Sequence, residues 1–269
     1  MKNKEKKTIV VDIEPLEEIK LPELEVHGVL RKARDWFSHM HHIVWTICSI
    51  VILALVMAFM PTYIWNAAWA GITTHKFLVF LIMIFSLIAV SLVWSLGQRI
   101  DVFVFMYFNM RGRHPRWLDW LMLGLTQLGN FIFASVVALI LYFSGNHLLA
   151  YELILGGLTL SLVVQLMKVL IHRTRPYIKL ENIRIVGSRE KGRSFPSGHT
   201  CQAFFMATLL LQYYHVPVFV WFALYALAAV VGVTRIYVGM HYPRDVLGGA
   251  ILGTTWGLLG VIVNSYLFG

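Results

Sequence analysis

The sequence has 269 residues, of which 58% are hydrophobic and 14% charged, and its formal net charge is +9 at pH 7. Soluble domains carry about 25% charged residues, so this composition excludes an ordinary soluble domain and indicates an integral membrane protein. In so hydrophobic a chain the positive charge suits an anionic lipid surface better than nucleic acid. We therefore expect membrane lipids, and no nucleic acid, as partners.

The first 42 residues differ in kind from the rest of the chain. They contain eight Lys/Arg and eight Asp/Glu with little apolar periodicity, which predicts a polar, mobile N-terminal tail over 1–42. Residues 43–76 are predicted to be an additional membrane segment, with an apolar run over 43–60, and its loop. Since the first apolar run begins this late, we expect no cleavable signal peptide.

Residues 77–269 are predicted to form one membrane domain, because six further apolar runs follow each other closely. A helix needs about 20 apolar residues to cross a bilayer. The expected fold class is therefore all-α, a polytopic transmembrane bundle with a six-helix core and one extra N-terminal segment. The six runs cover 77–96, 118–143, 150–171, 200–214, 216–234 and 246–267.

Two connections and two cysteines complete this outline. The aromatic and basic stretch 97–117 is expected to lie along the membrane surface. The loop 172–199 carries seven Lys/Arg and two Glu. Its excess of positive charge either fixes the orientation of the protein in the membrane or forms a site for an anion. Cys48 and Cys201 lie in apolar runs, and we expect both to be small buried hydrophobes, without a disulfide or a metal.

Three polar clusters interrupt the last apolar runs, and the first is "KVLIHRTRP". Lys168 and Arg175 are seven residues apart, which predicts the same face of a helix. Two cations on one face at a membrane boundary either anchor the helix or bind an anion. His172 and Arg173 are interpreted as structural or headgroup contacts.

The second cluster is "FPSGH", in which Pro196 and Gly198 predict a tight turn. Ser197 is expected to cap the helix that follows. The free N–H groups of that helix N-terminus suit a phosphate oxygen, and His199 in the first turn would point to the same place. Taken alone, the cluster is better explained by a simple helix cap beside an incidental histidine.

The third cluster is "TRIYVGMHYPRDV", with Arg235, His241 and Asp245. A spacing of four residues allows the Asp245 carboxylate to hold the His241 imidazole and fix its tautomer. The alternative is a pair of interfacial polar residues at a helix start. If the last four segments alternate across the membrane, all three clusters come to the same side, and together they indicate one site.

The three clusters resemble the signatures of the type 2 phosphatidic acid phosphatase (PAP2) family, also called the lipid phosphate phosphatase and vanadium haloperoxidase superfamily. The family pattern is Lys, six residues, Arg-Pro; then Pro-Ser-Gly-His; then Ser-Arg, five residues, His, three residues, Asp. Thr234 replaces the Ser before Arg235, and every other position matches. The resemblance covers about 77–267, including "LTQLGNF".

The resemblance implies a metal-independent lipid phosphate phosphatase without a cofactor. His241 would attack phosphorus and form a phosphohistidine, Asp245 would orient it, and His199 would act as the acid and then as the base. The implied phosphate-binding residues are Lys168, Arg175, Ser197, Gly198 and Arg235. The expected substrate is a phosphorylated lipid of the phosphatidic acid, phosphatidylglycerophosphate or undecaprenyl diphosphate type, in a multi-pass protein of a bacterial cell membrane.

Several alternatives stay open at this point. A lipid phosphotransferase would use the same histidine with an acceptor other than water, and an anionic lipid transporter would also need cations at helix ends. A metal-dependent hydrolase using His199, His241 and Asp245 as ligands is disfavoured, because three cations would repel a divalent ion. The basic residues near the start favour a cytoplasmic tail, and counting seven spans from it places the site on the cytoplasmic side. Similar bacterial proteins, in contrast, usually face outward. The oligomeric state is open.

Overall fold

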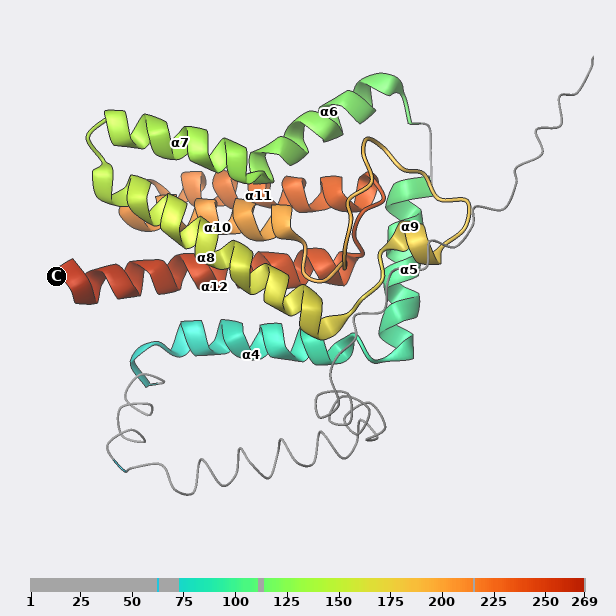
Figure 1. Ribbon diagram of the computed structural model, residues 1–269, viewed down its shortest axis with the longest axis horizontal. Helices are drawn as coiled ribbons and strands as arrows, with labels where there is room; N and C mark the ends of the chain where they lie inside the picture. Colours follow the sequence, from blue (N-terminus) through green and yellow to red (C-terminus); the bar gives the residue numbers. More distant parts are fainter. Residues whose placement is uncertain (1–61, 63–72, 111–113, 215, 269) are drawn as a thin grey trace, which may run out of the picture. The chain divides into compact units, whose positions relative to one another are not determined.

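The computed structural model describes residues 62, 73–110, 114–214 and 216–268. Apart from residue 62, they all fall in one compact unit, Ala68–Gly269. Every element of these described residues is helical (Figure 1), which confirms the predicted all-α class. The tail predicted over 1–42, the apolar run predicted over 43–60 and Cys48 lie outside the described residues.

Each of the six predicted apolar runs of the membrane domain is occupied by described helices, while α5 and α9 lie in the connections between runs. The labels follow Figure 1. They are α4 (Lys76–Ser91), α5 (Ser95–Met110), α6 (Arg116–Thr126), the 3₁₀ turn η1 (Gln127–Gly129), α7 (Phe131–Phe143), α8 (His147–Ile171), α9 (Pro176–Lys179), α10 (Gly198–Tyr213), α11 (Val218–Tyr237) and α12 (Pro243–Phe268).

Several of these helices are long and apolar enough to cross a membrane. Three single segments meet that condition: His147–Lys179, Val218–Tyr237 and Pro243–Val263. Two bent pairs, α4 with α5 and α6 with α7, raise the number to at most five among the described residues. Helix α10 has 16 residues, which agrees with the shortness of the run at 200–214. The protein is therefore a multi-pass membrane protein.

Two bends shape the N-terminal half of the described unit. Helix α5 is bent by 94° from α4. If α4 crosses the membrane, this angle lets α5 lie along the membrane surface, where the stretch 97–117 was expected. The prediction of one continuous segment over 118–143 is wrong in detail. The axes of α6 and α7 make a bend of 58° at the break between them. Asn130 accepts a hydrogen bond from the Ile132 amide at 3.2 Å and starts α7 anew. Gly129 lies against the His199 carbonyl, where a Cβ atom would not fit.

Helices α10 and α12 pack with their backbones in close approach. Gly249, Gly253 and Gly257 recur every four residues on α12 and face α10, and a Cβ atom at Gly253 would collide with the Cys201 carbonyl. Small residues at this spacing are a common means of bringing membrane helices together. Cys201 is buried in this contact, as predicted. The packing aligns the first turn of α10 with that of α12.

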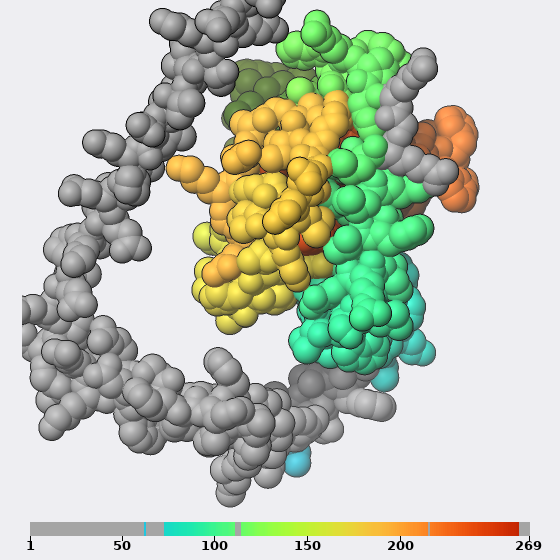
Figure 2. All heavy atoms as spheres, turned by 90° about the vertical axis from the view of Figure 1, so that its right-hand side faces the viewer, coloured from blue at the N-terminus to red at the C-terminus, as the bar shows by residue number. Residues whose placement is uncertain are grey.

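The ends of four segments meet at one end of the unit. In Figure 1 the C-terminal ends of α8 and α11 and the N-terminal ends of α10 and α12 all lie toward the right. Figure 2 views this side and shows the loop after α9 (gold) beside α5 (green). The Asn109 amide group donates hydrogen bonds to the carbonyls of Arg184 at 2.8 Å and Tyr237 at 2.9 Å, which ties the loop to α5 and α11. The three sequence clusters therefore come to the same side, as predicted.

Candidate active site

The first cluster is divided between two helices. His172 has a left-handed conformation with φ of 49° and ends α8, and Arg175 is the residue that precedes α9. The prediction that Lys168 and Arg175 share one helix face is therefore wrong. Lys168 stays on α8, while Arg175 is 1% exposed and extends under the loop that follows α9. Of the two roles left open for His172, its place at the end of α8 is the structural one.

The second cluster forms the turn that begins α10. Ser197 is at the N-cap position, but its side chain makes no capping hydrogen bond, contrary to our prediction. Its amide donates to the Asp245 carbonyl at 3.0 Å, and its Oγ accepts a hydrogen bond from Thr200 Oγ1 at 2.9 Å. The Ser197 amide is therefore engaged, while the hydroxyl keeps its own proton for another acceptor. His199 follows in the first turn.

The third cluster places His241 beside Asp245. His241 is 1% exposed and Asp245 is fully buried. Asp245 Oδ2 lies 3.6 Å from His241 Nδ1 and accepts the Tyr242 amide at 2.9 Å. On the other side of the ring, Arg175 Nη1 lies 3.3 Å from His241 Nε2. Since a guanidinium only donates, this contact assigns a lone pair to Nε2 and the proton to Nδ1, toward Asp245. Thr234 bonds within its own helix, to the Val231 carbonyl.

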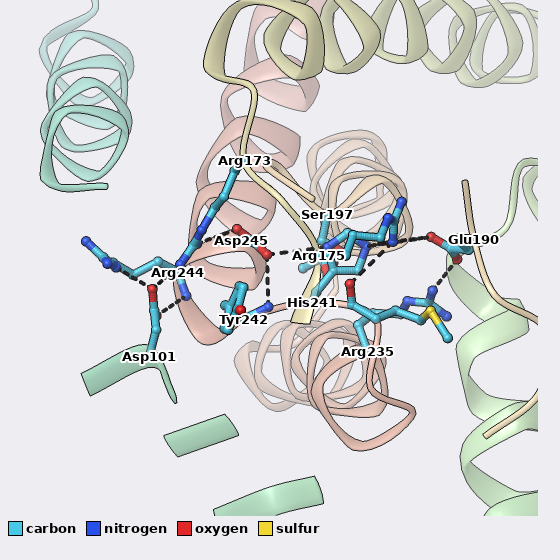
Figure 3. Close-up of polar contacts among 12 residues, drawn as sticks. Asp101, Arg173, Arg175, Glu190, Ser197, Arg235, His241, Tyr242, Arg244 and Asp245 are labelled. Atoms are coloured by element: carbon cyan, nitrogen blue, oxygen red, sulfur yellow. Dashed lines mark hydrogen bonds and ion pairs between the residues drawn. The ribbon is translucent and has the colours of Figure 1, made fainter. Parts of the chain in front are cut away.

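Arg173 holds Asp245 from behind, a role that the sequence interpretation missed. Its Nη1 donates to Asp245 Oδ1 at 2.5 Å, and its Nη2 forms an ion pair with Asp101 of α5. Asp101 also accepts from Arg244 Nε at 2.7 Å. Figure 3 shows this chain of charges running from Asp101 through Arg173 to Asp245. The contact with Asp101 could not be read from the motif spacing, because Asp101 belongs to α5 and to none of the three clusters.

The Glu190 carboxylate lies at the centre of the site, and sequence reasoning missed it too. Its Oε2 accepts from Arg175 Nη1 at 2.9 Å, and its Oε1 forms an ion pair with Arg235 (Figure 3). Oε1 is 3.6 Å from His199 Nδ1 and Oε2 is 3.7 Å from His241 Nε2. We call Arg175, Arg235, His199 and His241, the groups around this carboxylate, the anion site. The available signal was a lone acid in "REKGR".

The charge of Glu190 is stabilised by this environment. Burial alone would raise the pKa of its carboxyl, but the positive charge of Arg235 beside it helps to hold that pKa well below its ordinary value. Its backbone is also held, because the Tyr177 hydroxyl donates to the Glu190 carbonyl at 2.6 Å and Arg175 Nε donates to the Gly192 carbonyl at 3.1 Å. An ionised carboxylate is therefore kept between Arg175 and Arg235.

Fold and site together define an integral membrane protein with an anion site between two imidazoles at its helix ends. The family model of the PAP2 superfamily matches residues 148–268. Phosphatidylglycerophosphatase B of Bacillus subtilis is 31% identical over 157 residues, which cover 52% of this chain and 72% of that protein. The chain therefore belongs to the PAP2 superfamily.

Two further similarities extend this result. Undecaprenyl-diphosphatase of Sulfolobus acidocaldarius is 26% identical over 173 residues, covering 64% of this chain and 81% of that protein. The crystal structure of a transmembrane PAP2 type phosphatidylglycerolphosphate phosphatase from Bacillus subtilis superimposes with a TM-score of 0.62 at 26% identity, covering 71% of this chain and 96% of that one. These relatives are phosphatases of membrane lipids by name.

Replacing Arg173 by Lys should lower kcat about 10- to 100-fold with little change in KM. A lysine keeps the charge but cannot bond two carboxylates at once, so Asp245 would lose its fixed orientation while the anion site stays intact. Steady-state kinetics on purified protein checks this prediction. Arg184→Lys is the matched control, because Arg184 pairs with Asp119 away from His241. A loss confined to KM, or an equal loss in the control, would contradict the positioning role.

Replacing Glu190 by Gln should tighten inhibition by inorganic phosphate about 10-fold. The amide keeps the shape of the side chain but no longer competes as an anion for Arg175 and Arg235. The measurement is the inhibition constant of phosphate, compared with that of Glu181→Gln, the other acid of this loop. An unchanged or weaker inhibition in Glu190→Gln would show that the carboxylate does not compete with the ligand.

Proposed function

We propose that this protein hydrolyses phosphorylated membrane lipids through a phosphohistidine on His241. The observation that carries the proposal is the place of the Glu190 carboxylate, which is held by Arg175 and Arg235 with one imidazole near each oxygen. A phosphoryl group in that place would have a nucleophile on one side and a proton donor on the other. Phosphoryl transfer depends chiefly on such positioning and on neutralised charge.

His241 is the proposed nucleophile because Nε2 presents a lone pair to the anion site. Asp245, close to Nδ1 on the far side of the ring, holds the proton there and stabilises the positive charge that develops as Nε2 bonds to phosphorus. Arg173 keeps this carboxylate ionised and oriented. The backbone of the Pro-Ser-Gly turn is joined to the same helix start through the Ser197 amide.

His199 is the proposed general acid for the leaving group. Its Nδ1 is near the opposite oxygen of the Glu190 carboxylate, so it can give a proton to the leaving oxygen and then take one from water in the second step. That water would break the P–N bond, release inorganic phosphate and restore His241. Phosphate release in plain buffer separates this reaction from transfer to another acceptor.

The proposed phosphate-binding groups are Lys168, Arg175, Arg235, the Ser197 hydroxyl and the Gly198 amide. Two of them, Arg175 and Arg235, are buried and fixed by hydrogen bonds, Arg235 also to Thr126 Oγ1 at 2.9 Å. Fixed cations in a site of low dielectric stabilise the charge of the transition state without reorganising. We therefore propose a reaction that requires no metal ion.

The proposed substrates are lipids of the classes named by the relatives, including a phosphatidylglycerophosphate and undecaprenyl diphosphate. The proposed location is the cell membrane. Residues 77–269 are proposed as the catalytic domain, with 1–42 as an appended tail and 43–76 as an additional membrane segment. The compact unit that begins at Ala68 supports a boundary in this region.

The test compares an activated and an unactivated phosphate ester in buffer containing EDTA. The wild type should release phosphate from both. His241→Ala should abolish activity on both esters, since no other group could form the covalent intermediate. His199→Ala should lose about 10²–10⁴-fold on an alkyl phosphate and much less on p-nitrophenyl phosphate, whose leaving group needs little protonation.

The activity of Asp245→Asn should lie between the activities of His241→Ala and His199→Ala, because the His241 imidazole remains but loses its charge partner. The alkyl and aryl esters must be measured under conditions in which hydrolysis of the intermediate is not limiting. Equal losses of His199→Ala on both esters would overturn the acid assignment. Substantial activity of His241→Ala on either ester would overturn the proposed nucleophile.

A further inference from the structure

A cavity of about 450 Å³ opens at the site end of the described unit, on the side of Asp245 that Arg173 holds. It lies between the end of α4, the start of α5, the end of α8 and α9. None of the groups of the anion site lines it. Figure 3 shows Arg173 and Glu190 on opposite sides of His241 and Asp245, so the cavity is separate from the place proposed for the phosphoryl group.

The wall of this cavity has an apolar half and a basic half. The ends of α4 and α8 form most of the apolar half, and two of its residues, Val93 and Leu170, are 81% and 63% exposed. Trp94, next to Val93, is exposed too, and tryptophan is enriched where a membrane meets water. The polar and basic half consists of Gln98, His172, Arg173, Thr174 and Lys179.

The basic half carries positive charge that no carboxylate of the wall balances. The described residues that line the cavity include no Asp or Glu. Lys179 forms no ion pair with a described carboxylate. Arg173 is paired with Asp101 and Asp245, yet its side chain is 13% exposed and keeps N–H donors beyond those two bonds. A group with several anionic oxygens therefore fits this half of the cavity.

We propose that this cavity binds the headgroup of an anionic membrane phospholipid that is not the substrate. The phosphodiester would contact Arg173, Thr174 and Lys179, and the start of the acyl chains would lie along the apolar half toward the bilayer. A free phosphate would leave the apolar half unfilled. Cationic side chains at the membrane surface are attracted to anionic headgroups in the same way.

The bound headgroup would act on catalysis through Arg173, and this effect rests on the function proposed above. Arg173 belongs to the connection 172–175 between α8 and α9, in which Thr174 is exposed. A headgroup that joins Thr174 to Lys179 of α9 would restrict this connection, so that Arg173 holds Asp245 in place for a larger share of the time. We expect an anionic lipid to raise kcat and to leave KM for a soluble ester unchanged.

The experiment measures hydrolysis of p-nitrophenyl phosphate in micelles of phosphatidylcholine with an increasing share of phosphatidylglycerol, a phosphodiester without a terminal phosphoryl group. The wild-type kcat should rise saturably by about 5-fold or more, as is typical of coupled sites. Lys179→Gln should need about 10-fold more phosphatidylglycerol for half of the effect, because it loses a bond between charged groups. Arg99→Gln, which removes the same charge from an exposed residue of α5 outside the cavity, should behave as the wild type.

Three results would overturn the proposal. Equal shifts in Lys179→Gln and Arg99→Gln would show a general attraction to an anionic surface. A rise in KM at constant kcat would show competition at the anion site. Glycerophosphoglycerol, the same headgroup without acyl chains, should not raise kcat at the same concentration, and an equal rise would exclude a lipid as the ligand.

Hydrogen exchange on the wild type keeps the proposal testable if a variant does not fold. Phosphatidylglycerol should slow the exchange of backbone amides in residues 172–180 compared with phosphatidylcholine alone. Unchanged exchange would overturn the binding site. Slower exchange in a wild type that releases no phosphate would instead support the lipid site and contradict the proposed function, which separates the two failures.

Discussion

The buried carboxylate of Asp245 is the constraint on which the rest of the site depends. A charge removed from water must be paired, and Asp245 finds its partner in Arg173, whose second N–H group requires Asp101. This one chain of ion pairs joins the start of α12, the segment after α8 and the middle of α5 (Figure 3). Removing Arg173 would leave the buried charge of Asp245 uncompensated, at a cost of about 3–5 kcal/mol. The orientation of His241 is therefore set by contacts that lie outside the anion site.

The need to pair a buried charge also explains the anion site, where the buried groups are cations and the partner is an anion. Arg175 and Arg235 are both buried, and Glu190 supplies the anion that balances them. The Glu190 side chain is 29% exposed and belongs to a loop, so it can be displaced more readily than the two arginines. A phosphoryl group that enters would exchange one anion for another, and the positive groups would stay in place. The site is thus preorganised for the charge of its ligand.

Much of the fold and of the site could be predicted from local patterns. Apolar runs predicted the helices, and the parity of the last segments predicted that Lys168, His199 and His241 come together. The failures concern the backbone and distant partners. No periodicity shows that His172 ends α8 in a left-handed conformation and separates Lys168 from Arg175. Nor does it show that the run over 118–143 is bent where Asn130 starts α7. Asp101 and Glu190 match no motif, since their contacts with Arg173, Arg175 and Arg235 arise only from the tertiary structure.

The most direct test of the account is to trap the covalent intermediate. Wild-type protein mixed with a substrate carrying ³²P in its terminal phosphate and quenched in alkali within milliseconds should carry an alkali-stable, acid-labile label. Peptide mapping should place that label on His241. The label should be absent from His241→Ala and decay more slowly in His199→Ala, which lacks the base for the second step. A label on another residue, or turnover without any label, would contradict His241 as the nucleophile.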